Sequence, residues 1–328
     1  MKAAVVTALG GPEMLVLQEV PDPIAATNEI LVKVHYSGIN YADTLARRGI
    51  VPTPPVPFVM GLEIVGTVAA IGEGVEGFTV GQPVAAYTQS GYAQYAAIPA
   101  TLAVPLDIPG HSIAPERAIG LPCTGVTAHQ LLTLVGRLSD GETVFVQGAT
   151  GGVGTMLGQQ AKALGAGRVI GSVGSTSKVD FALQHGYDDA ILSERFLNGL
   201  KEITGGRGVD LFLEGVSGSN LASPGAFLAP LGRAVYFGDV NFSSDTEIAI
   251  KQLRSGNWTV AGYSLGSLCA TAPEYWKPSA IAVLAMIADG MIHDTAVTMF
   301  TPAEASKAHE LIESRRSQGK LGIDWSAL

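Results

Sequence analysis

The sequence predicts an α/β protein that combines a β-rich domain with a doubly wound parallel-sheet domain. Its 328 residues exceed what one hydrophobic core usually holds, so two domains are expected. Up to about Leu121 the chain consists of short apolar segments separated by Gly and Pro, which is typical of a partly open β-barrel. Beyond Leu121, strand-like and helix-like segments alternate, which predicts a parallel sheet with helices on both faces.

The composition indicates a well-buried globular protein. Hydrophobic residues make up 47% of the chain and charged residues 15%, which excludes a disordered chain. The net charge of −9 argues against a nucleic-acid groove as the main function. Glu63 and several glycines interrupt the longest apolar segment, so we expect no membrane span. The two cysteines, Cys123 and Cys269, are too few for a disulfide scaffold and are compatible with a reducing, cytoplasmic location.

Strand candidates follow one another in the first domain. The run from Ala3 to Thr7 belongs to an apolar segment too short for a secretory signal, and it predicts a first strand. The segment EILVKVHYSG places Ile30, Val32 and Val34 on one face of a strand. EIVGTVAAIG and FTVGQPVAAY predict further strands.

The second domain begins with strand TVFVQG at 143–148 and a helix from about Val153, whose apolar residues recur at helical spacing. Strand RVIGSV, helix KVDFALQHG, strand DAIL, helix RFLNGLKEI, strand VDLFLE and strand RAVYFG follow. Near the C-terminus, EYWKPSAIAVLAMIADG and TPAEASKAHELIESRR predict two helices, and a capping box of Thr301 and Glu304 begins the second. LGIDW predicts a final strand.

The stretch QGATGGVG predicts a dinucleotide-binding turn between a strand and a helix. Ala149, Gly151 and Gly154 occupy the positions of the G-x-G-x-x-G fingerprint. Small residues there allow a tight turn, the approach of a pyrophosphate and close packing of the helix. The N–H groups at the helix start, those of Gly152 and Val153 included, are expected to bind the phosphates.

The next strand predicts which dinucleotide is bound. In dinucleotide-binding folds this strand often ends in Asp or Glu, which binds the adenosine ribose. Here VIGSVGSTSK contains no acid: Gly174 lets the loop approach, Ser175 can donate a hydrogen bond and Lys178 supplies positive charge. This set suits a 2′-phosphate, so the sequence predicts NADPH as cofactor. The alternative that Lys178 only faces solvent stays open.

Further motifs resemble those of a known family. The stretch GLEIVGTVAAIGEGVEGFTVGQPV resembles the signature G-x-E-x-x-G-x-V-x-x-x-G-x-x-V-x-x-F of the medium-chain dehydrogenase/reductase superfamily. The matching positions are Gly61, Glu63, Gly66, Val68, Gly72, Val75 and Phe78. SGINYAD, QGATGGVG and ESRRSQGK are similar to its zinc-free, zeta-crystallin-like quinone oxidoreductase branch. The resemblance implies a GroES-like catalytic domain at 1–118 and 264–328, a Rossmann domain at 119–263, and a homodimer.

The resemblance also bears on metals and on chemistry. Zinc enzymes of the superfamily bind their catalytic ion through Cys and His, but Asn40 and Leu62 occupy these positions here. We therefore expect no metal site. Without a metal to polarise an alcohol, the expected reaction is hydride transfer from NADPH to a small electron-poor acceptor, a quinone or an α,β-unsaturated carbonyl.

The resemblance implies roles for individual residues. Asn40 and Asp43 align with the polar pair beside the nicotinamide and are the predicted catalytic residues, with loop stabilisation as the alternative. Arg315 matches an arginine that reaches the 2′-phosphate, with a solvated helix end as its alternative. The remaining predicted cofactor contacts are Thr127, Phe237, Gly238, Ser264 and Leu265.

Three positions depart from the branch and leave the natural acceptor open. Leu45, Val51 and Ser193 stand where branch members carry tyrosines, so quinone activity does not follow directly from the resemblance. Two other functions stay open as well. One is a non-catalytic, crystallin-like NADPH-binding protein, and the other is an enzyme of the alcohol dehydrogenase type.

Overall fold

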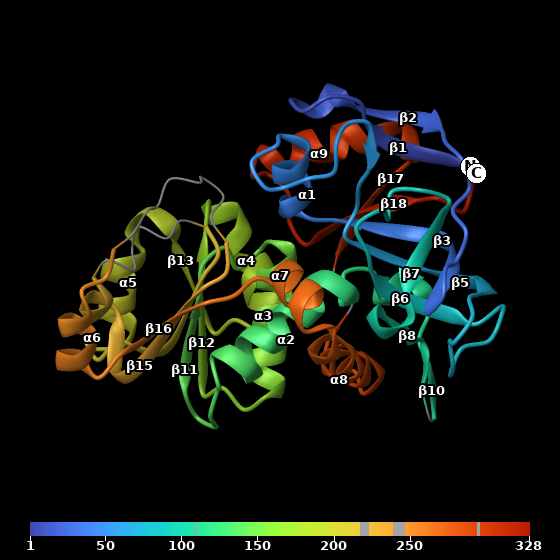
Figure 1. Ribbon diagram of the computed structural model, residues 1–328. Coiled ribbons are helices and arrows are strands. Elements are labelled where there is room, and N and C mark those ends of the chain that lie inside the picture. Colours follow the sequence, from blue (N-terminus) through green and yellow to red (C-terminus); the bar gives the residue numbers. More distant parts are fainter. Residues whose placement is uncertain (109, 217–222, 239–246, 294–295) are drawn as a thin grey trace. The chain divides into compact units, whose positions relative to one another are not determined.

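The computed structural model of the chain consists of two units, which are described separately here. It describes residues 1–108, 110–216, 223–238, 247–293 and 296–328. The first unit comprises Met1–Val126, Leu268–Asp289 and Asp294–Leu328, and the second comprises Thr127–Ser267 and Gly290–His293. The chain therefore leaves the first unit, builds the second, and returns to complete the first (Figure 1).

A six-stranded sheet forms the second unit, and every pair of neighbouring strands in it is parallel. The strands are β11 (Thr143–Val146), β12 (Arg168–Val173), β13 (Asp189–Leu192), β14 (Val209–Glu214), β15 (Leu228–Tyr236) and β16 (Thr259–Gly262). Their order across the sheet is β13-β12-β11-β14-β15-β16, which is the order of a Rossmann fold. The predicted doubly wound parallel sheet is confirmed.

Helices cover both faces of this sheet. They include α3 (Gly152–Ala163), α4 (Val179–Gln184), α5 (Phe196–Ile203) and α6 (Ile250–Gly256). Helices α3 and α4 lie on one face, and α5 and α6 lie on the other (Figure 1). A parallel strand needs a crossover that returns the chain to the same edge of the sheet, which explains why helices alternate with strands.

Stacked phenylalanines form part of the core of this unit. The ring centroid of Phe145 lies 4.9 Å from that of Phe212 and 5.6 Å from that of Phe196. Phe227 packs on the same ring, with its centroid 4.2 Å from that of Phe212. Burial of each ring stabilises the fold by about 1.5–3 kcal/mol. Because Phe145 belongs to β11, this core anchors the strand from which the glycine turn starts.

The first unit is β-rich, as predicted for a GroES-like domain. Its largest sheet has the order β17-β18-β3-β5-β6-β8, and β7 also pairs with β3. These strands are β3 (Glu29–Ile39), β5 (Glu63–Ile71), β6 (Pro83–Tyr87), β7 (Tyr95–Pro99), β8 (Ala103–Pro105), β17 (Val297–Phe300) and β18 (Lys320–Asp324). Two smaller sheets contain β1 (Lys2–Val6), β2 (Leu15–Glu19), β4 (Phe58–Val59), β9 (Asp107–Ile108) and β10 (His111–Ser112).

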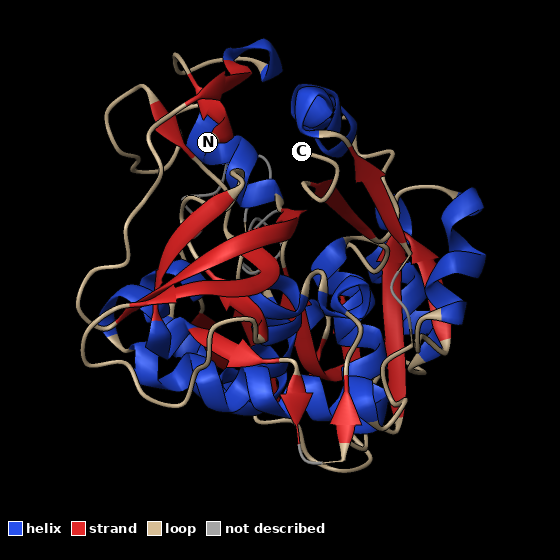
Figure 2. Cartoon of the chain, turned by 90° about the vertical axis from the view of Figure 1, so that its right-hand side faces the viewer, coloured by secondary structure: helices blue, strands red, loops and turns tan. Residues whose placement is uncertain are grey.

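The C-terminal segment completes this first unit. It supplies helices α8 (Trp276–Ala288) and α9 (Ala305–Glu313), and its strand β18 pairs antiparallel with β3. The side chain of Gln94 donates to the carbonyl of Leu328 (3.0 Å), and its backbone N–H donates to the carbonyl of Lys2 (3.1 Å). Both chain ends accordingly lie on one side of the unit (Figures 1 and 2).

A long apolar helical segment runs from Pro115 to Val135. It consists of short turns, with π-helical geometry on both sides of α2 (Val126–Gln130). The segment has the length and hydropathy of a membrane-spanning helix, but 72% of its most apolar window is buried inside the protein. Such burial is typical of a core helix.

Some predicted element boundaries are wrong for local reasons. In FTVGQPVAAY only Pro83–Tyr87 is a strand, because the preceding residues form a turn in which Gly81 has a φ of +89°. The strand predicted to include Phe237 and Gly238 ends at Tyr236. The helix predicted from Glu274 begins at Trp276, which places Pro278 in its first turn. The capping box of Thr301 and Glu304 is confirmed, at a 3₁₀ turn directly before α9.

Gly154 lies where α3 passes closest to the turn that precedes it. A Cβ at this position would lie 2.2 Å from the carbonyl oxygen of Gly148, and this backbone oxygen cannot rotate away as a side chain can. We expect Gly154→Ala to lower the free energy of unfolding by about 3 kcal/mol, at the upper end of overpacking costs. The matched control is Gly151→Ala, whose Cβ would lie 3.6 Å from the same oxygen. Urea denaturation measures both variants, and equal stabilities would contradict the packing argument.

Candidate functional site

The predicted dinucleotide-binding turn joins β11 to α3 in the second unit. Gly148 begins it with a φ of +73°, a conformation that favours glycine. The N–H of Gly148 donates to the Ser172 hydroxyl (3.2 Å), and that of Ala149 donates to the Ser172 carbonyl (2.9 Å), which ties the turn to β12. Gly151 caps α3 without a side chain. The first N–H groups of a helix have no partner within it, so this helix start presents donors to an anionic group.

The three fingerprint positions are small for different reasons. Gly154 is required by the backbone of the protein itself, as shown above. Ala149 is fully buried, and its methyl group is accommodated because Gly171 on β12 has no side chain: a Cβ there would lie 2.5 Å from it. Gly151 is exposed and has no such neighbour in the protein. Its missing side chain leaves space outside the chain, where a pyrophosphate is expected.

The loop after β12 holds the predicted 2′-phosphate contacts. Gly174 is exposed, and a Cβ there would meet no heavy atom within 4 Å. The hydroxyl of Ser175 lies 2.9 Å from that of Ser177. Lys178 is half-buried directly before α4, and burial lowers its pKa. Open space, hydroxyl groups and a cation suit a phosphate group.

Two other predicted segments follow β15 and β16. The N–H of Phe237 donates to the carbonyl of Glu214 (2.9 Å) at the end of β14, and its ring covers Gly215. The Ser264 hydroxyl accepts the N–H of Ser267 (3.3 Å), beside Leu265 at the start of α7 (Leu265–Thr271). Gly238 follows Phe237 beside the carbonyl of Gly215.

These segments lie at one edge of the parallel sheet. The N–H of Tyr263 donates to the carbonyl of Tyr236 (2.8 Å), so the chain after β16 runs beside the end of β15. The Tyr263 hydroxyl also donates to the side chain of Gln130 (2.7 Å), which is in α2 with Thr127. The second unit thereby brings its predicted contacts to the carboxyl ends of its strands, where ligands of such sheets bind.

In the first unit, Asn40 and Asp43 form the N-terminal cap of α1 (Tyr41–Arg47). A carboxylate oxygen of Asp43 accepts the N–H of Asn40 (2.7 Å) and the hydroxyl of Tyr92 (2.8 Å). Burial raises the pKa of Asp43 to about 7, while the hydrogen bonds from Asn40 and Tyr92 act in the opposite direction. These are the contacts of loop-stabilising groups, and a catalytic role of either residue stays a prediction.

A buried ion pair beside Asn40 is absent from the sequence-based expectations. Lys320 on β18 pairs with Glu63 on β5, and both side chains are almost fully buried. Glu63 belongs to the superfamily signature and Lys320 ends the motif ESRRSQGK, so each residue was visible in the sequence. No sequence signal joins them, because their contact depends on the pairing of β3 with both β5 and β18.

A second buried group lies on the other side of Asp43. The Tyr92 hydroxyl lies 3.4 Å from Nε2 of His309, which is fully buried in α9. Burial, and to a lesser degree the positive charge of Arg47, lower the pKa of His309 to about 3. The imidazole is therefore neutral at physiological pH.

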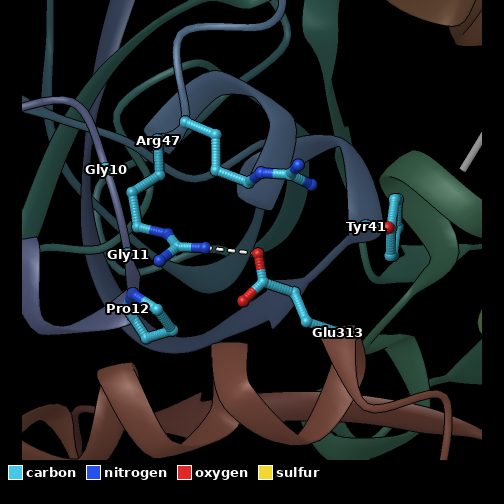
Figure 3. A pocket seen from close by; sticks show the side chains of 7 residues that line it. Gly10, Gly11, Pro12, Tyr41, Arg47 and Glu313 are labelled. Atoms are coloured by element: carbon cyan, nitrogen blue, oxygen red, sulfur yellow. Dashed lines mark hydrogen bonds and ion pairs between the residues drawn. The ribbon is translucent and has the colours of Figure 1, made fainter. Parts of the chain in front are cut away.

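A pocket of about 470 Å³ lies at α1 and the C-terminal end of α9 (Figure 3). In it, fully buried Arg47 donates to the carboxylate of Glu313. The lining residues are Gly10, Gly11, Pro12, Tyr41, Arg47, Arg48 and Glu313, none of which is a predicted site residue. Arg315 follows α9 directly and is exposed, with a φ of +58°.

The described part of the chain was also searched for metal ligands. Within it, no three His, Cys, Asp or Glu side chains form a group that could hold a metal ion. Both cysteines are buried, and burial raises the pKa of Cys269 to about 12 and that of Cys123 well above its usual range. Zinc binds the thiolate form, which these surroundings disfavour.

Two family models match the chain: an alcohol dehydrogenase GroES-like domain at residues 26–110 and a zinc-binding dehydrogenase at residues 152–285. Quinone oxidoreductase 1 of Escherichia coli is 33% identical over 315 residues, which cover 94% of this chain and 95% of that protein. A phenolphthiocerol/phthiocerol polyketide synthase component of Mycobacterium tuberculosis is 31% identical over 300 residues, which cover 90% of this chain and 13% of that protein.

A solved structure shows the same relationship. The crystal structure of Escherichia coli quinone oxidoreductase complexed with NADPH matches 99% of this chain and 100% of its own, with a TM-score of 0.89 and 30% sequence identity. Together with the glycine turn, the parallel sheet and the β-rich first unit, these matches identify the family. The chain belongs to the quinone oxidoreductase branch of the medium-chain dehydrogenase/reductase superfamily.

Proposed function

We propose that the protein is an NADPH-dependent, metal-independent reductase that transfers hydride to quinones or α,β-unsaturated carbonyl compounds. At the level of the family, it is a quinone oxidoreductase-like reductase. The finer proposal rests on the end of β12, where a loop without carboxylates carries Ser175 and Lys178. The same strand is hydrogen-bonded to the glycine turn through Ser172.

The residues of this loop suit NADPH better than NADH. The two cofactors differ only in the 2′-phosphate, so the groups around the adenosine ribose decide between them. Gly174 leaves open space, Ser175 offers a hydroxyl group, and Lys178 offers a cation. A relative that crystallised with NADPH supports the same choice.

The chemistry needs little from the protein beyond binding and orientation. NADPH supplies the hydride when it is bound. The helix start of α3 is proposed to hold the pyrophosphate, and the backbone of Phe237 and Gly238 to contact the nicotinamide carboxamide. A quinone or enone accepts hydride because its conjugated carbonyl delocalises the negative charge, and a proton then follows from water or a weak donor.

The acceptor class includes compounds with the same electronic structure. Enoyl thioesters also carry a C=C bond conjugated to a carbonyl, and the match to a segment of a polyketide synthase supports testing them. A non-catalytic NADPH-binding protein and a zinc-dependent alcohol dehydrogenase are the competing functions.

A screen of NADPH oxidation tests the proposed function. We expect turnover with quinones, enones or enoyl thioesters, unaffected by a chelator because no step uses a metal. The variant Gly151→Ala should retain stability but lower turnover at limiting NADPH about tenfold or more, because its methyl group displaces the pyrophosphate. NADPH binding without oxidation by any acceptor would favour the non-catalytic alternative. Stoichiometric zinc, with turnover lost on chelation, would favour the alcohol dehydrogenase.

Lys178→Ala tests the choice of cofactor. A charge-assisted hydrogen bond contributes about 1.5–3 kcal/mol, so the Kd for NADPH should rise about tenfold to hundredfold while that for NADH stays unchanged. Fluorescence titration measures both constants. The control Lys201→Ala removes an exposed lysine of α5 and should change neither. Equal weakening of both nucleotides, or of neither, would contradict the role of Lys178.

Arg315→Gly separates binding from stability at the end of α9. The left-handed conformation of Arg315 costs a side-chain-bearing residue about 1–2 kcal/mol, and glycine is commonly found at such helix ends. The variant should therefore unfold at the same or a higher temperature, yet bind NADPH about tenfold more weakly and NADH unchanged. Arg316→Gly is the neighbouring control. Unchanged NADPH affinity in Arg315→Gly would assign the arginine to the helix end alone.

A further inference from the structure

The ammonium group of Lys320 is buried in the first unit among three acceptors. It donates to the side-chain oxygen of Asn40 (2.7 Å) and to the carbonyl of Ile39 (2.9 Å), and it pairs with Glu63. The exposed fractions of the Lys320 and Glu63 side chains are 3% and 1%. An ammonium group has three N–H donors, so this set uses all of them.

Glu63 is held equally firmly on its other sides. One carboxylate oxygen accepts the side-chain N–H of Asn40 (3.1 Å), and the other accepts the backbone N–H of Cys123 (3.0 Å). Gly38 lies opposite Glu63 in the pairing of β3 with β5, and a Cβ at Gly38 would lie 2.3 Å from the carboxylate. The absence of a side chain at position 38 therefore makes room for the charge.

This ion pair fixes the direction of the Asn40 amide. Lys320 can only donate hydrogen bonds and a carboxylate can only accept them, so the amide oxygen must face Lys320 and the amide nitrogen must face Glu63. A flipped amide would place N–H against the ammonium and oxygen against the carboxylate. The second N–H of the amide has only a long contact, 3.4 Å to the carbonyl of Gly38.

We propose that Lys320 is a positioning residue, which together with Glu63 holds the Asn40 amide as a hydrogen-bond donor to the carbonyl oxygen of the acceptor. This inference rests on the proposed function, in which the acceptor is a quinone or an enone. The carbonyl oxygen of such an acceptor becomes more negative as hydride arrives, so a fixed donor binds the transition state more strongly than the ground state. Loss of the pair should accordingly lower kcat and leave NADPH binding unchanged.

The test removes both charges together. Lys320→Met alone would leave Glu63 buried without a counter-ion, which can prevent folding. The double variant Lys320→Met/Glu63→Gln replaces the pair with neutral side chains of similar size and frees the amide to flip. We expect kcat about tenfold to hundredfold lower, with the Kd for NADPH unchanged. Lys320→Arg keeps a cation and should restore part of the loss, and Lys307→Met, which removes an exposed lysine, should change neither constant.

A double-mutant cycle tests whether the pair acts through Asn40. In an Asn40→Ala background, removal of the pair should lower kcat no further, because there is no amide left to orient. A merely structural pair would instead lower kcat by the same factor in both backgrounds. That additive result, or an unchanged kcat in the double variant, would overturn the proposal.

A second readout does not depend on activity. The chain has six asparagines, so selective ¹⁵N labelling gives a small set of side-chain signals, and the signal lost in Asn40→Ala identifies Asn40. We expect slow exchange of its amide protons with water in the wild type and faster exchange in the double variant. Unchanged exchange would refute the orienting role of Lys320. If the wild type reduces no acceptor, the proposed function fails, while this measurement still decides whether Lys320 orients Asn40.

Discussion

Parallel strands deliver their carboxyl ends to one edge of a sheet, and the arrangement of the second unit depends on this constraint. Segments that are widely separated in the sequence meet at that edge because each follows a parallel strand. The glycine turn follows β11, the Lys178 loop follows β12, and Phe237 follows β15. The crossovers that parallel pairing requires also supply the helix whose N-terminus faces the pyrophosphate in the proposed binding mode.

The first unit contains a feature that hydrophobic packing alone does not explain. A buried ion pair loses much of its Coulombic gain to desolvation, and apolar side chains of similar size are often as stable. Here Lys320 and Glu63 are surrounded by partners that use all three ammonium donors and both carboxylate oxygens. Such a set contributes specificity of geometry rather than net stability, and the group whose geometry it specifies is the side chain of Asn40.

The sequence predicts features that depend on nearby residues, and it misses those that depend on distant pairing. The fingerprint from Ala149 to Gly154 and the capping box at Thr301 each depend on residues within a few positions, so both were predictable. Contacts such as that of Ala149 with Gly171, or of Lys320 with Asn40, require strands to pair in a particular register. The turn before β6 was missed because apolar Phe78 and Val80 flank Thr79 and imitate a strand.

Residue choices that folding does not explain are the most informative about ligands. Gly154 is required by the backbone it touches, so its presence says only that α3 packs closely. Gly151 and Gly174 have no close neighbour in the protein, although alanine would lose less conformational entropy on folding. Arg315 shows the reverse, since a bulky residue occupies a left-handed position that glycine would fill with less strain. Because stability alone would select other residues at all three positions, we attribute these choices to the groups that the protein binds there.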